Sequence, residues 1–372
     1  MAIFLQKLWR SLLDRLVPIL AGLALVLGVA IASRFIHSLI TNPTLSKSIS
    51  EILIAVLFGL ILRSLLGQGA QTKAGIRFAI QRLLRLGIVL LGLRLSLQDV
   101  AATGLTALAL VTICISAALL MAYLAGRLFH VPARLAALIG VGTAICGNSA
   151  IIATAPVLEA DEEEMSFAVA TITLFGLLAV LIYPIIGHQF GLSDRAFGLW
   201  AGTAVNDTSQ VVAVGAIFSQ AALEVATVVK LTRNTLMAPL IVLIGLIYSR
   251  GLQQKQSSQA RAAARLKWRN LIPGFVLGFL LMSLIRTVGV ATGILPQDVT
   301  HPGNLETAAN ILKALDQVSR FTILMALAAV GLNTDLASLR RIGLKPLIIG
   351  TCVAALLAIL SLGLILFTPL GS

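Results

Sequence analysis

Length, composition and charge exclude an ordinary soluble domain. The chain has 372 residues, of which 58% are hydrophobic and only 12% are charged, and its mean hydropathy is +0.99. Soluble domains do not combine these values. We therefore expect an all-α polytopic membrane protein, in which every buried backbone group finds its hydrogen-bond partner within the protein.

Apolar runs long enough to cross a hydrocarbon core of about 30 Å recur along the whole chain. They predict about eleven transmembrane helices, in chain order 17–39, 49–67, 80–97, 104–127, 135–158, 165–187, 196–217, 223–249, 270–290, 307–332 and 346–368.

The basic residues orient these spans by the positive-inside rule. With a cytoplasmic N-terminus, the cytoplasmic side receives Lys7, Arg10, Arg15, Arg63, Lys73, Arg77, Arg82, Arg85, Arg127, Arg134, Arg195, Arg250, Lys255, Arg261, Arg265, Lys267, Arg269, Arg340, Arg341 and Lys345. The other side receives Arg34, Lys47, Arg94, Arg286, Lys313 and Arg320, and the acidic run "EADEEE" (159–164). An odd number of spans then places the C-terminus outside.

The net charge of +13 is explained by this topology, so we expect no nucleic-acid partner. Cys114, Cys146 and Cys352 are isolated, and the four histidines are scattered. Their spacing predicts neither a disulfide nor a metal site. We expect no cofactor.

Two polar stretches interrupt the apolar pattern and resemble each other. "GTAICGNSAIIATA" begins at Gly142 and "GTAVNDTSQVVAVG" at Gly202, an offset of 60 residues. If both segments cross the membrane fully, the two breaks enter from the same side. A fainter pair, "GLRLSLQDV" from Gly92 and "GLNTDLASL" from Gly331, has opposite orientations in the predicted topology, as an inverted repeat requires.

The first break predicts a cavity, because backbone that leaves the helix within hydrocarbon needs polar partners. Thr143, Asn148 and Ser149 supply side-chain donors and acceptors, and a half-helix that restarts after the break directs its positive end at an anion. The alternative is a close contact between helices through small residues.

The second break contains Asp207, an ionisable residue near the middle of a predicted span. The next span carries Lys230 and Arg233, three residues apart on one helical face, with Asn234 beside them. One cation could neutralise Asp207 while the other binds an anionic substrate. The alternative is a fully paired polar cluster that fixes helix packing.

These motifs together resemble a known family. "GVGTAICGNSAIIATAPV", the acidic run, "WAGTAVNDTSQVVAVG" and "VVKLTRNTLMAPLIV" resemble the YeiH-type sulfate exporter family of bacterial inner-membrane proteins, and the resemblance extends over nearly the whole chain. It implies a multi-pass transporter of the plasma membrane, related to bile-acid and sodium symporter-like folds with inverted five-helix repeats and broken helices. The implied organisation is one transporter domain over 1–372, with an extra helix in 1–48 and repeats in 49–190 and 191–372.

The resulting hypothesis is secondary transport of a small anion, sulfate or a related sulfur oxyanion, by alternating access. Thr143, Asn148, Ser149, Lys230, Arg233 and Asn234 would bind the anion. Asn206, Asp207, Thr208 and Ser209 would bind the coupling ion, H⁺ or Na⁺, because carboxylate and hydroxyl oxygens suit a hard cation. No GxxxxGK[ST] motif is present to bind ATP.

Other functions remain open at this stage. An organic acid or another small solute could be the cargo, and an anion channel would share the polar breaks. A structural or sensory membrane protein would use the same charges for packing. We expect no enzyme, because Ser149 and Ser209 have no intramembrane histidine as a base. The sequence predicts no particular oligomeric state.

Overall fold

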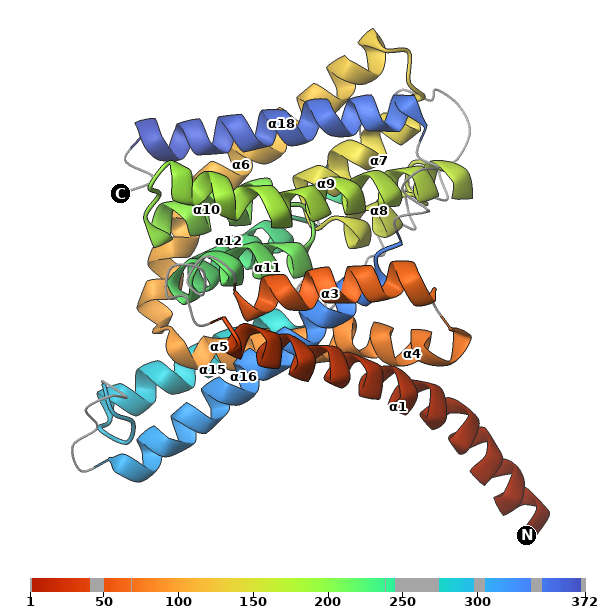
Figure 1. Cartoon of the computed structure of the whole chain (residues 1–372). Coiled ribbons are helices and arrows are strands. Elements are labelled where there is room, and N and C mark those ends of the chain that lie inside the picture. The colour runs from red at the N-terminus through yellow and green to blue at the C-terminus, as the bar shows by residue number, and fades with distance from the viewer. Residues whose placement is uncertain are drawn as a thin grey trace. The chain divides into compact units, whose positions relative to one another are not determined.

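The computed structural model describes residues 2–40, 50–67, 69–237, 239–244, 274–297, 305–335 and 343–368. Within these residues every regular element is a helix (Figure 1). Seven helices are long and apolar enough to cross a membrane: Leu16–Ser38, Leu97–Leu128, Glu162–Gln189, Gln220–Ile244, Gly274–Ala291, Glu306–Asn333 and Leu344–Phe367. The chain is therefore an all-helical multi-pass membrane protein, as predicted. The predicted cytoplasmic segment 250–269 lies outside the described residues.

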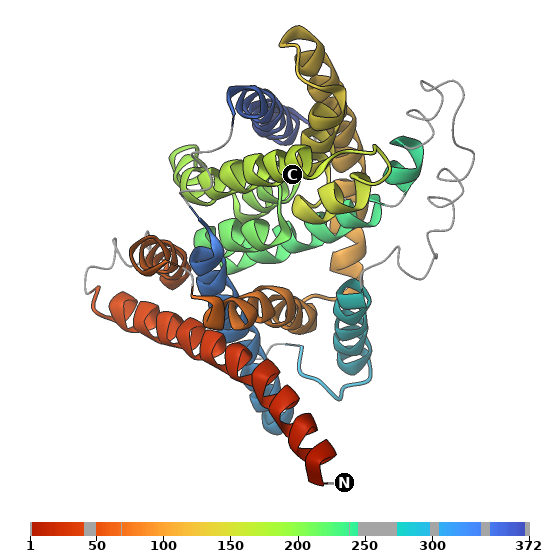
Figure 2. The same ribbon diagram turned by 90° about the vertical axis from the view of Figure 1, so that its right-hand side faces the viewer.

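The helices belong to two compact units, whose chain segments can be followed by colour in Figures 1 and 2. Unit 1 comprises Met1–Leu97 and Gly278–Leu336, and unit 2 comprises Gln98–Leu277 and Ala337–Ser372. Unit 1 contains α1 (Ala2–Ser38), α3 (Glu51–Leu66), α4 (Ala70–Phe78), η1 (Ala79–Leu83), α5 (Leu84–Leu91), η2 (Gly92–Arg94), most of α15 (Gly274–Ala291) and α16 (Glu306–Asn333). Unit 2 contains α6 (Leu97–Leu128), α7 (Ala133–Ala144), α8 (Asn148–Thr154), α9 (Glu162–Gln189), α10 (Asp194–Ala204), α11 (Thr208–Phe218), α12 (Gln220–Thr235) and α18 (Leu344–Phe367).

Unit 1 packs its helices closely through glycines. α1 crosses α4 at Gly22, where a Cβ would lie 2.6 Å from the Cα of Gly75. α3 crosses α16 at Gly59, where a Cβ would lie 2.6 Å from the carbonyl oxygen of Ala328. Such small residues let helix backbones approach within a bilayer, where association depends on van der Waals packing. The buried side chains of this core are Val26, Val29, Ala30, Ala55, Ile76, Ala79, Leu324, Ala328, Ala329 and Leu332.

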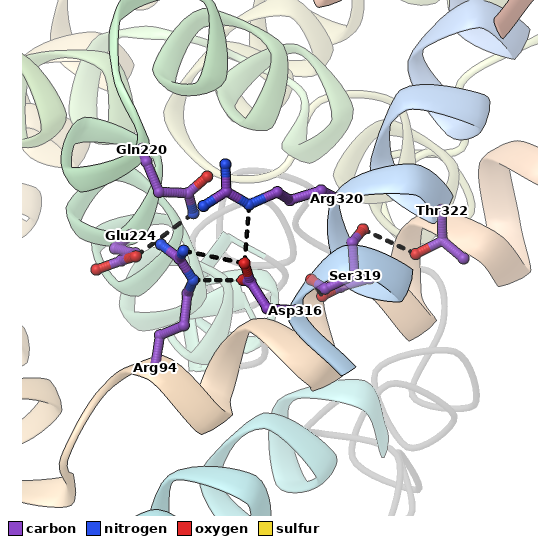
Figure 3. A network of polar contacts seen from close by, with 8 residues as sticks. Arg94, Gln220, Glu224, Asp316, Ser319, Arg320 and Thr322 are labelled. Carbon is purple, nitrogen blue, oxygen red and sulfur yellow. Dashed lines mark hydrogen bonds and ion pairs between the residues drawn. The ribbon is translucent and has the colours of Figure 1, made fainter. Parts of the chain in front are cut away.

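An ion-pair network joins η2 to α16 within unit 1 (Figure 3). Arg94 Nε donates to Asp316 Oδ1 at 2.5 Å and its Nη2 donates to Oδ2 at 3.2 Å. Arg320 Nε donates to Oδ2 of the same carboxylate at 2.9 Å. The two-point contact of Arg94 fixes the geometry as well as the charge. This network therefore holds the end of the 70–94 helical segment on α16.

In unit 2, residues 133–159 form a helical hairpin, hairpin A, with α7 and α8 as its arms. The chain reverses after α7, where Gly147 has φ +70°, a backbone conformation that favours glycine. At the open end, Arg134 Nη1 donates to the carbonyl oxygen of Glu159 at 2.7 Å. Both ends of the segment therefore lie together, and the expectation of one full crossing over 135–158 is wrong.

Residues 194–219 form a second hairpin, hairpin B, with α10 and α11 as its arms. Ser219 Oγ donates to Asp194 Oδ1 at 2.6 Å, and the rings of Phe197 and Phe218 stack with centroids 3.8 Å apart. These contacts close the open end, so the expected full crossing over 196–217 is also wrong. The two predicted breaks are present, but each one turns the chain back instead of interrupting a helix that continues.

The two hairpins open toward opposite ends of α9. Glu159, at the open end of hairpin A, precedes the start of α9 by three residues. The ring of Phe218, at the open end of hairpin B, stacks on His188 at the end of α9, with centroids 4.4 Å apart. α9 has 28 residues and a length of roughly 42 Å, whereas α7 has 12 residues and a length of roughly 18 Å. Each hairpin thus reaches about half-way along α9, and the expectation that both breaks enter from one side is wrong.

Candidate functional site

The tip of hairpin A is the turn between α7 and α8, and the tip of hairpin B is the turn between α10 and α11. The two tips meet beside the middle of α9. A Cβ on Gly142 would lie 3.0 Å from Ile172 Cγ1, and Gln210 Nε2 donates to the carbonyl oxygen of Thr173 at 3.4 Å. The tips also touch each other, because a Cβ on Gly147 would lie 3.2 Å from Asp207 Oδ2. The structure therefore brings the two repeated sequence motifs to one place.

Lys230 of α12 is fully buried at this meeting point. Its Nζ donates to the carbonyl oxygens of Ile145 at 2.7 Å and Val205 at 3.1 Å, and it also donates to that of Asn206. Three acceptors around Nζ require three N–H donors, so the contacts fit the charged ammonium form. In this conformation the Lys230 head group has no donor left for a substrate.

Arg233, one turn along the same face of α12, is 1% exposed and binds both hairpins as well. Its Nε donates to the carbonyl oxygen of Ala144 at 2.6 Å, and its Nη2 donates to that of Thr143. Its Nη1 donates to the carbonyl oxygens of Thr203 at 2.9 Å and Val205 at 3.0 Å. These carbonyls belong to the C-terminal ends of α7 and α10, which lack intrahelical donors and carry the negative end of the helix dipole. The two cations therefore cap two half-helices at once.

Asp207 is the N-cap of α11. Its Oδ1 accepts from the Ser209 backbone N–H at 2.9 Å and from Ser209 Oγ at 2.7 Å. Gln210 Oε1 in turn accepts from the Asp207 backbone N–H at 3.3 Å, which completes a capping box. The ion pairs found among the described residues do not include Asp207. Lys230 and Arg233 donate to backbone carbonyls instead, so the predicted ion pair of Asp207 with one of these cations does not form in this structure.

Three asparagine side chains at the tips contain buried oxygens without a donor. Oδ1 of Asn148, Asn206 and Asn234 each has no hydrogen-bond partner among the described residues. Asn206 and Asn234 are 2% and 4% exposed, and Asn234 Nδ2 contacts Thr208 Oγ1 at 3.4 Å. An unsatisfied buried acceptor costs about 1–3 kcal/mol, so this concentration of acceptors marks a place where a further group can bind.

The remaining predicted residues lie at the same tips but have different surroundings. Thr143 is buried and its Oγ1 donates to the Ile139 carbonyl oxygen at 2.8 Å, so this hydroxyl serves its own helix. Ser149 is exposed and Asn148 is partly exposed. The structure thus brings all ten predicted site residues to the hairpin tips or to α12 beside them, and it leaves Asn148 and Ser149 as the accessible ones on hairpin A.

The likeness of the two motifs extends to three dimensions. Thr203 Oγ1 donates to the Leu199 carbonyl oxygen at 2.7 Å, which repeats the Thr143 to Ile139 bond at the offset of 60 residues. Gly202 faces Val229 of α12 as Gly142 faces Ile172 of α9, an offset of 57 residues. Hairpin A with α9 and hairpin B with α12 are therefore two copies of one motif with opposite orientations.

This correspondence assigns Gly176 of α9 to the place of Arg233 on α12, at the same offset of 57 residues. A Cβ on Gly176 would lie only 1.7 Å from Gln210 Oε1, so the Gln210 amide occupies the space beside Gly176. The sequence reading missed Gln210. The signal was present, because Asp-x-x-Gln before an apolar run is a capping-box pattern.

The comparisons with known proteins agree with this picture of a membrane protein. The model of the family described as "Conserved hypothetical protein 698" matches residues 21–350. The chain belongs to this family. A "UPF0324 membrane protein" of Streptococcus mutans is 34% identical over 349 residues, which are 93% of this chain and 96% of that protein. Relatives with the same family designation in Fusobacterium nucleatum and Streptococcus agalactiae are 34% and 36% identical, and cover 83% and 86% of this chain and 88% and 89% of their own lengths.

The family assignment and the long spans make this UPF0324 protein a multi-pass membrane protein with bacterial homologues. Its described residues contain no group of three or more His, Cys, Asp or Glu side chains that could hold a metal ion. The polar chemistry of unit 2 therefore rests on amides, hydroxyls, one carboxylate and two cations at the tips.

Proposed function

We propose that this UPF0324 protein is a secondary transporter that moves a small anion by alternating access, coupled to Na⁺ or H⁺. Sulfate or a related sulfur oxyanion is the proposed cargo, because the tip motifs resemble those of the YeiH-type exporters. The observation that carries the proposal is the charge at the tips: two buried cations, Lys230 and Arg233, stand against one carboxylate, Asp207.

The excess positive charge favours an anion as cargo. The backbone carbonyls satisfy the donors of Lys230 and Arg233, but they carry dipoles and no net charge. A net buried charge is expensive in a medium of low dielectric constant. An anion at the tips would offset that cost, whereas a neutral solute would leave it unchanged.

The anion would bind on the accessible side of hairpin A. Ser149 is exposed and Asn148 is partly exposed, and both lie at the start of α8. In this arrangement Lys230 and Arg233 act through their charge and hold the tips in place, while Asn148 and Ser149 make the direct contacts. This modifies the prediction that a lysine or arginine head group contacts the substrate.

The hairpins also change the proposed topology. With hairpins A and B as re-entrant elements, the eleven predicted spans become nine crossings and two half-crossings, and the C-terminus remains external for a cytoplasmic N-terminus. Arg195 moves to the outside, and the acidic run 159–164 moves to the cytoplasmic side, where Asp161 and Glu164 cap the start of α9. Opposed re-entrant hairpins place a binding site at the bilayer midplane with access from either side.

We propose that the protein lies in the bacterial plasma membrane. We propose for it neither a catalytic activity nor a nucleic-acid partner. Non-helical backbone at membrane depth is tolerated where it lines a polar cavity, and such backbone is a recurring feature of transporters. A channel shares this feature, so transport must be distinguished by kinetics.

The test is counterflow in proteoliposomes that contain the full-length protein. We expect unlabelled internal sulfate to accelerate the entry of labelled sulfate with saturation. Ser149→Ala should lower this rate, whereas Ser116→Ala, which removes an exposed hydroxyl from α6, should not.

Each outcome of this experiment has a defined meaning. Counterflow of carboxylates but not sulfate would replace sulfate by an organic acid. Flux that neither saturates nor shows counterflow would identify a channel. No flux of any anion, with the protein monodisperse and folded, would overturn the proposal.

A further inference from the structure

The unsatisfied oxygens at the tips need either a hydrogen-bond donor or a cation as a partner. Asn206 carries the clearest of them: its side chain is buried, its Oδ1 has no donor among the described residues, and its backbone carbonyl accepts from Lys230. Asn234 Oδ1 is in the same state one turn beyond Lys230 on α12. Buried amide oxygens are seldom left in this way.

Two further oxygens lie beside these amides. Asp207 follows Asn206 in the chain, and its Oδ1 receives both bonds from Ser209, while its Oδ2 lies toward Gly147 of hairpin A. Thr208 Oγ1 is 3.4 Å from Asn234 Nδ2. One carboxylate, one hydroxyl and the amide oxygens therefore come from the tips of both hairpins and from α12.

The proposed anion cannot satisfy these groups, because a deprotonated oxyanion offers acceptors only. A proton would neutralise Asp207 and leave the amide oxygens unpaired, since amides are not protonated near neutral pH. A hard cation satisfies both kinds of oxygen, as carboxylate, amide carbonyl and hydroxyl oxygens are its usual ligands.

The charge balance selects a monovalent cation. Lys230, Arg233 and Asp207 together carry a net charge of +1 in their ionised forms. Adding one monovalent cation and one dianion brings the total to zero. A divalent cation with the same dianion would leave the buried tips at +1, with only one carboxylate to hold the metal.

We infer that the hairpin tips bind one Na⁺ ion through Asp207, Thr208 and the side-chain oxygens of Asn206 and Asn234, with Asn148 adjoining from hairpin A, together with one dianion. The inference rests on the proposed function for the identity of the anion. It specifies the coupling ion as Na⁺, and it makes the two ligands mutually dependent, because each neutralises the charge that the other adds.

The first test measures the thermal stability of the purified full-length protein in the presence of sulfate, while Na⁺ replaces choline at constant ionic strength, with K⁺ as a second series. We expect Na⁺, but not K⁺, to raise the stability of the wild type with saturation. Asn206→Ala should abolish this response. It should also equal or exceed the wild type in stability without Na⁺, because it removes an unsatisfied buried acceptor.

Asn310→Ala is the matched control, since it removes an exposed amide from α16 in unit 1 and should keep the Na⁺ response. A purely structural Asn206 would make Asn206→Ala less stable with and without Na⁺, and that result would overturn the inference. Equal stabilisation by Na⁺, K⁺ and choline would also overturn it and would indicate that water fills the site.

The second test measures sulfate binding with and without Na⁺. Coupled sites change each other's affinity about 5–150-fold, so we expect at least a tenfold tightening by Na⁺ in the wild type and none in Asn206→Ala. Sulfate counterflow that is indifferent to Na⁺ would reject the Na⁺ site and leave the proposed function intact. Saturable Na⁺ binding without transport of any anion would reject the proposed function and leave the Na⁺ site.

Discussion

Hairpins A and B are copies of one motif that use different chemistry at corresponding places. In hairpin B the second arm, α11, begins with Asp207 and its capping box, whereas in hairpin A the second arm, α8, begins at Gly147 without a side-chain cap. The helix that follows hairpin B carries two cations, and the helix that follows hairpin A carries Thr173 and Gly176 at the corresponding positions. The difference concentrates charge on one copy and leaves the other open for a ligand.

The two copies nevertheless depend on a single set of supports. Lys230 and Arg233 extend from α12, yet they bind carbonyls at the ends of both α7 and α10. Gln210 of hairpin B reaches across to the Thr173 carbonyl oxygen of α9. The two motifs therefore share their contacts. α12 binds both tips through Lys230 and Arg233, and α9 contacts Gln210 of hairpin B at Thr173 and Gly176.

The largest expected effect concerns the orientation of α9. In a Cys352→Ser background the remaining cysteines, Cys114 and Cys146, are buried. A new cysteine at Glu163→Cys should then react with an impermeant maleimide from the cytoplasmic side only, and one at Gln189→Cys from the outside only. Both residues are exposed at the ends of α9. Eleven full crossings predict the reverse for both positions, so this labelling pattern distinguishes re-entrant hairpins from complete spans.

Removal of Arg233 should have the largest effect on stability. In Arg233→Gln several buried carbonyls of α7 and α10 lose their donors at about 1–3 kcal/mol each, so we expect a total loss of at least ~3 kcal/mol. Thermal unfolding in detergent measures it, with Arg320→Gln as the control, since the Arg320 side chain is half exposed. A loss under ~1 kcal/mol would show that the two tips hold together without this residue.

The space beside Gly176 offers a test of moderate size. Gly176→Ala places a methyl group where the Gln210 amide lies, and we expect a loss of about 1–3 kcal/mol. Gln210→Ala should remove much of that clash, so the double variant should lose less than the sum of the single variants. Strict additivity would mean that the two residues do not share this space.

The smallest expected effect concerns the cap of α11. Asp207→Ala should cost about 1 kcal/mol, whereas Asp207→Asn should fold nearly as well as the wild type, because asparagine is an equally good N-cap. In transport the two variants should not differ, because both lose the carboxylate on which the ion coupling depends. Gradient-dependent transport by Asp207→Asn would remove this carboxylate from the mechanism.

The sequence predicted which polar residues lie together better than it predicted the path of the chain. The offset of 60 residues between the motifs at Gly142 and Gly202 is also the offset between the Thr143 and Thr203 hydroxyl bonds in the structure. Polar residues within apolar runs are costly in lipid, so they stand out in a sequence. Hydropathy cannot distinguish one helix of 24 residues from two half-length arms that turn back, because both expose similar apolar surfaces. The predicted repeats 49–190 and 191–372 stay a prediction. In the element order, hairpin A comes near the end of the first range and hairpin B at the start of the second.

The sequence by itself determined that the chain is a helical membrane protein, where its polar breaks lie and which charges belong near them, because each of these follows from the cost of polar groups in hydrocarbon. Only the tertiary structure decided that the breaks are hairpin tips, that they approach from opposite ends of α9 and that Lys230 and Arg233 bind carbonyls of both. Those outcomes depend on which helix ends lie within a hydrogen bond of one another, and residues up to 90 positions apart in the chain make these contacts.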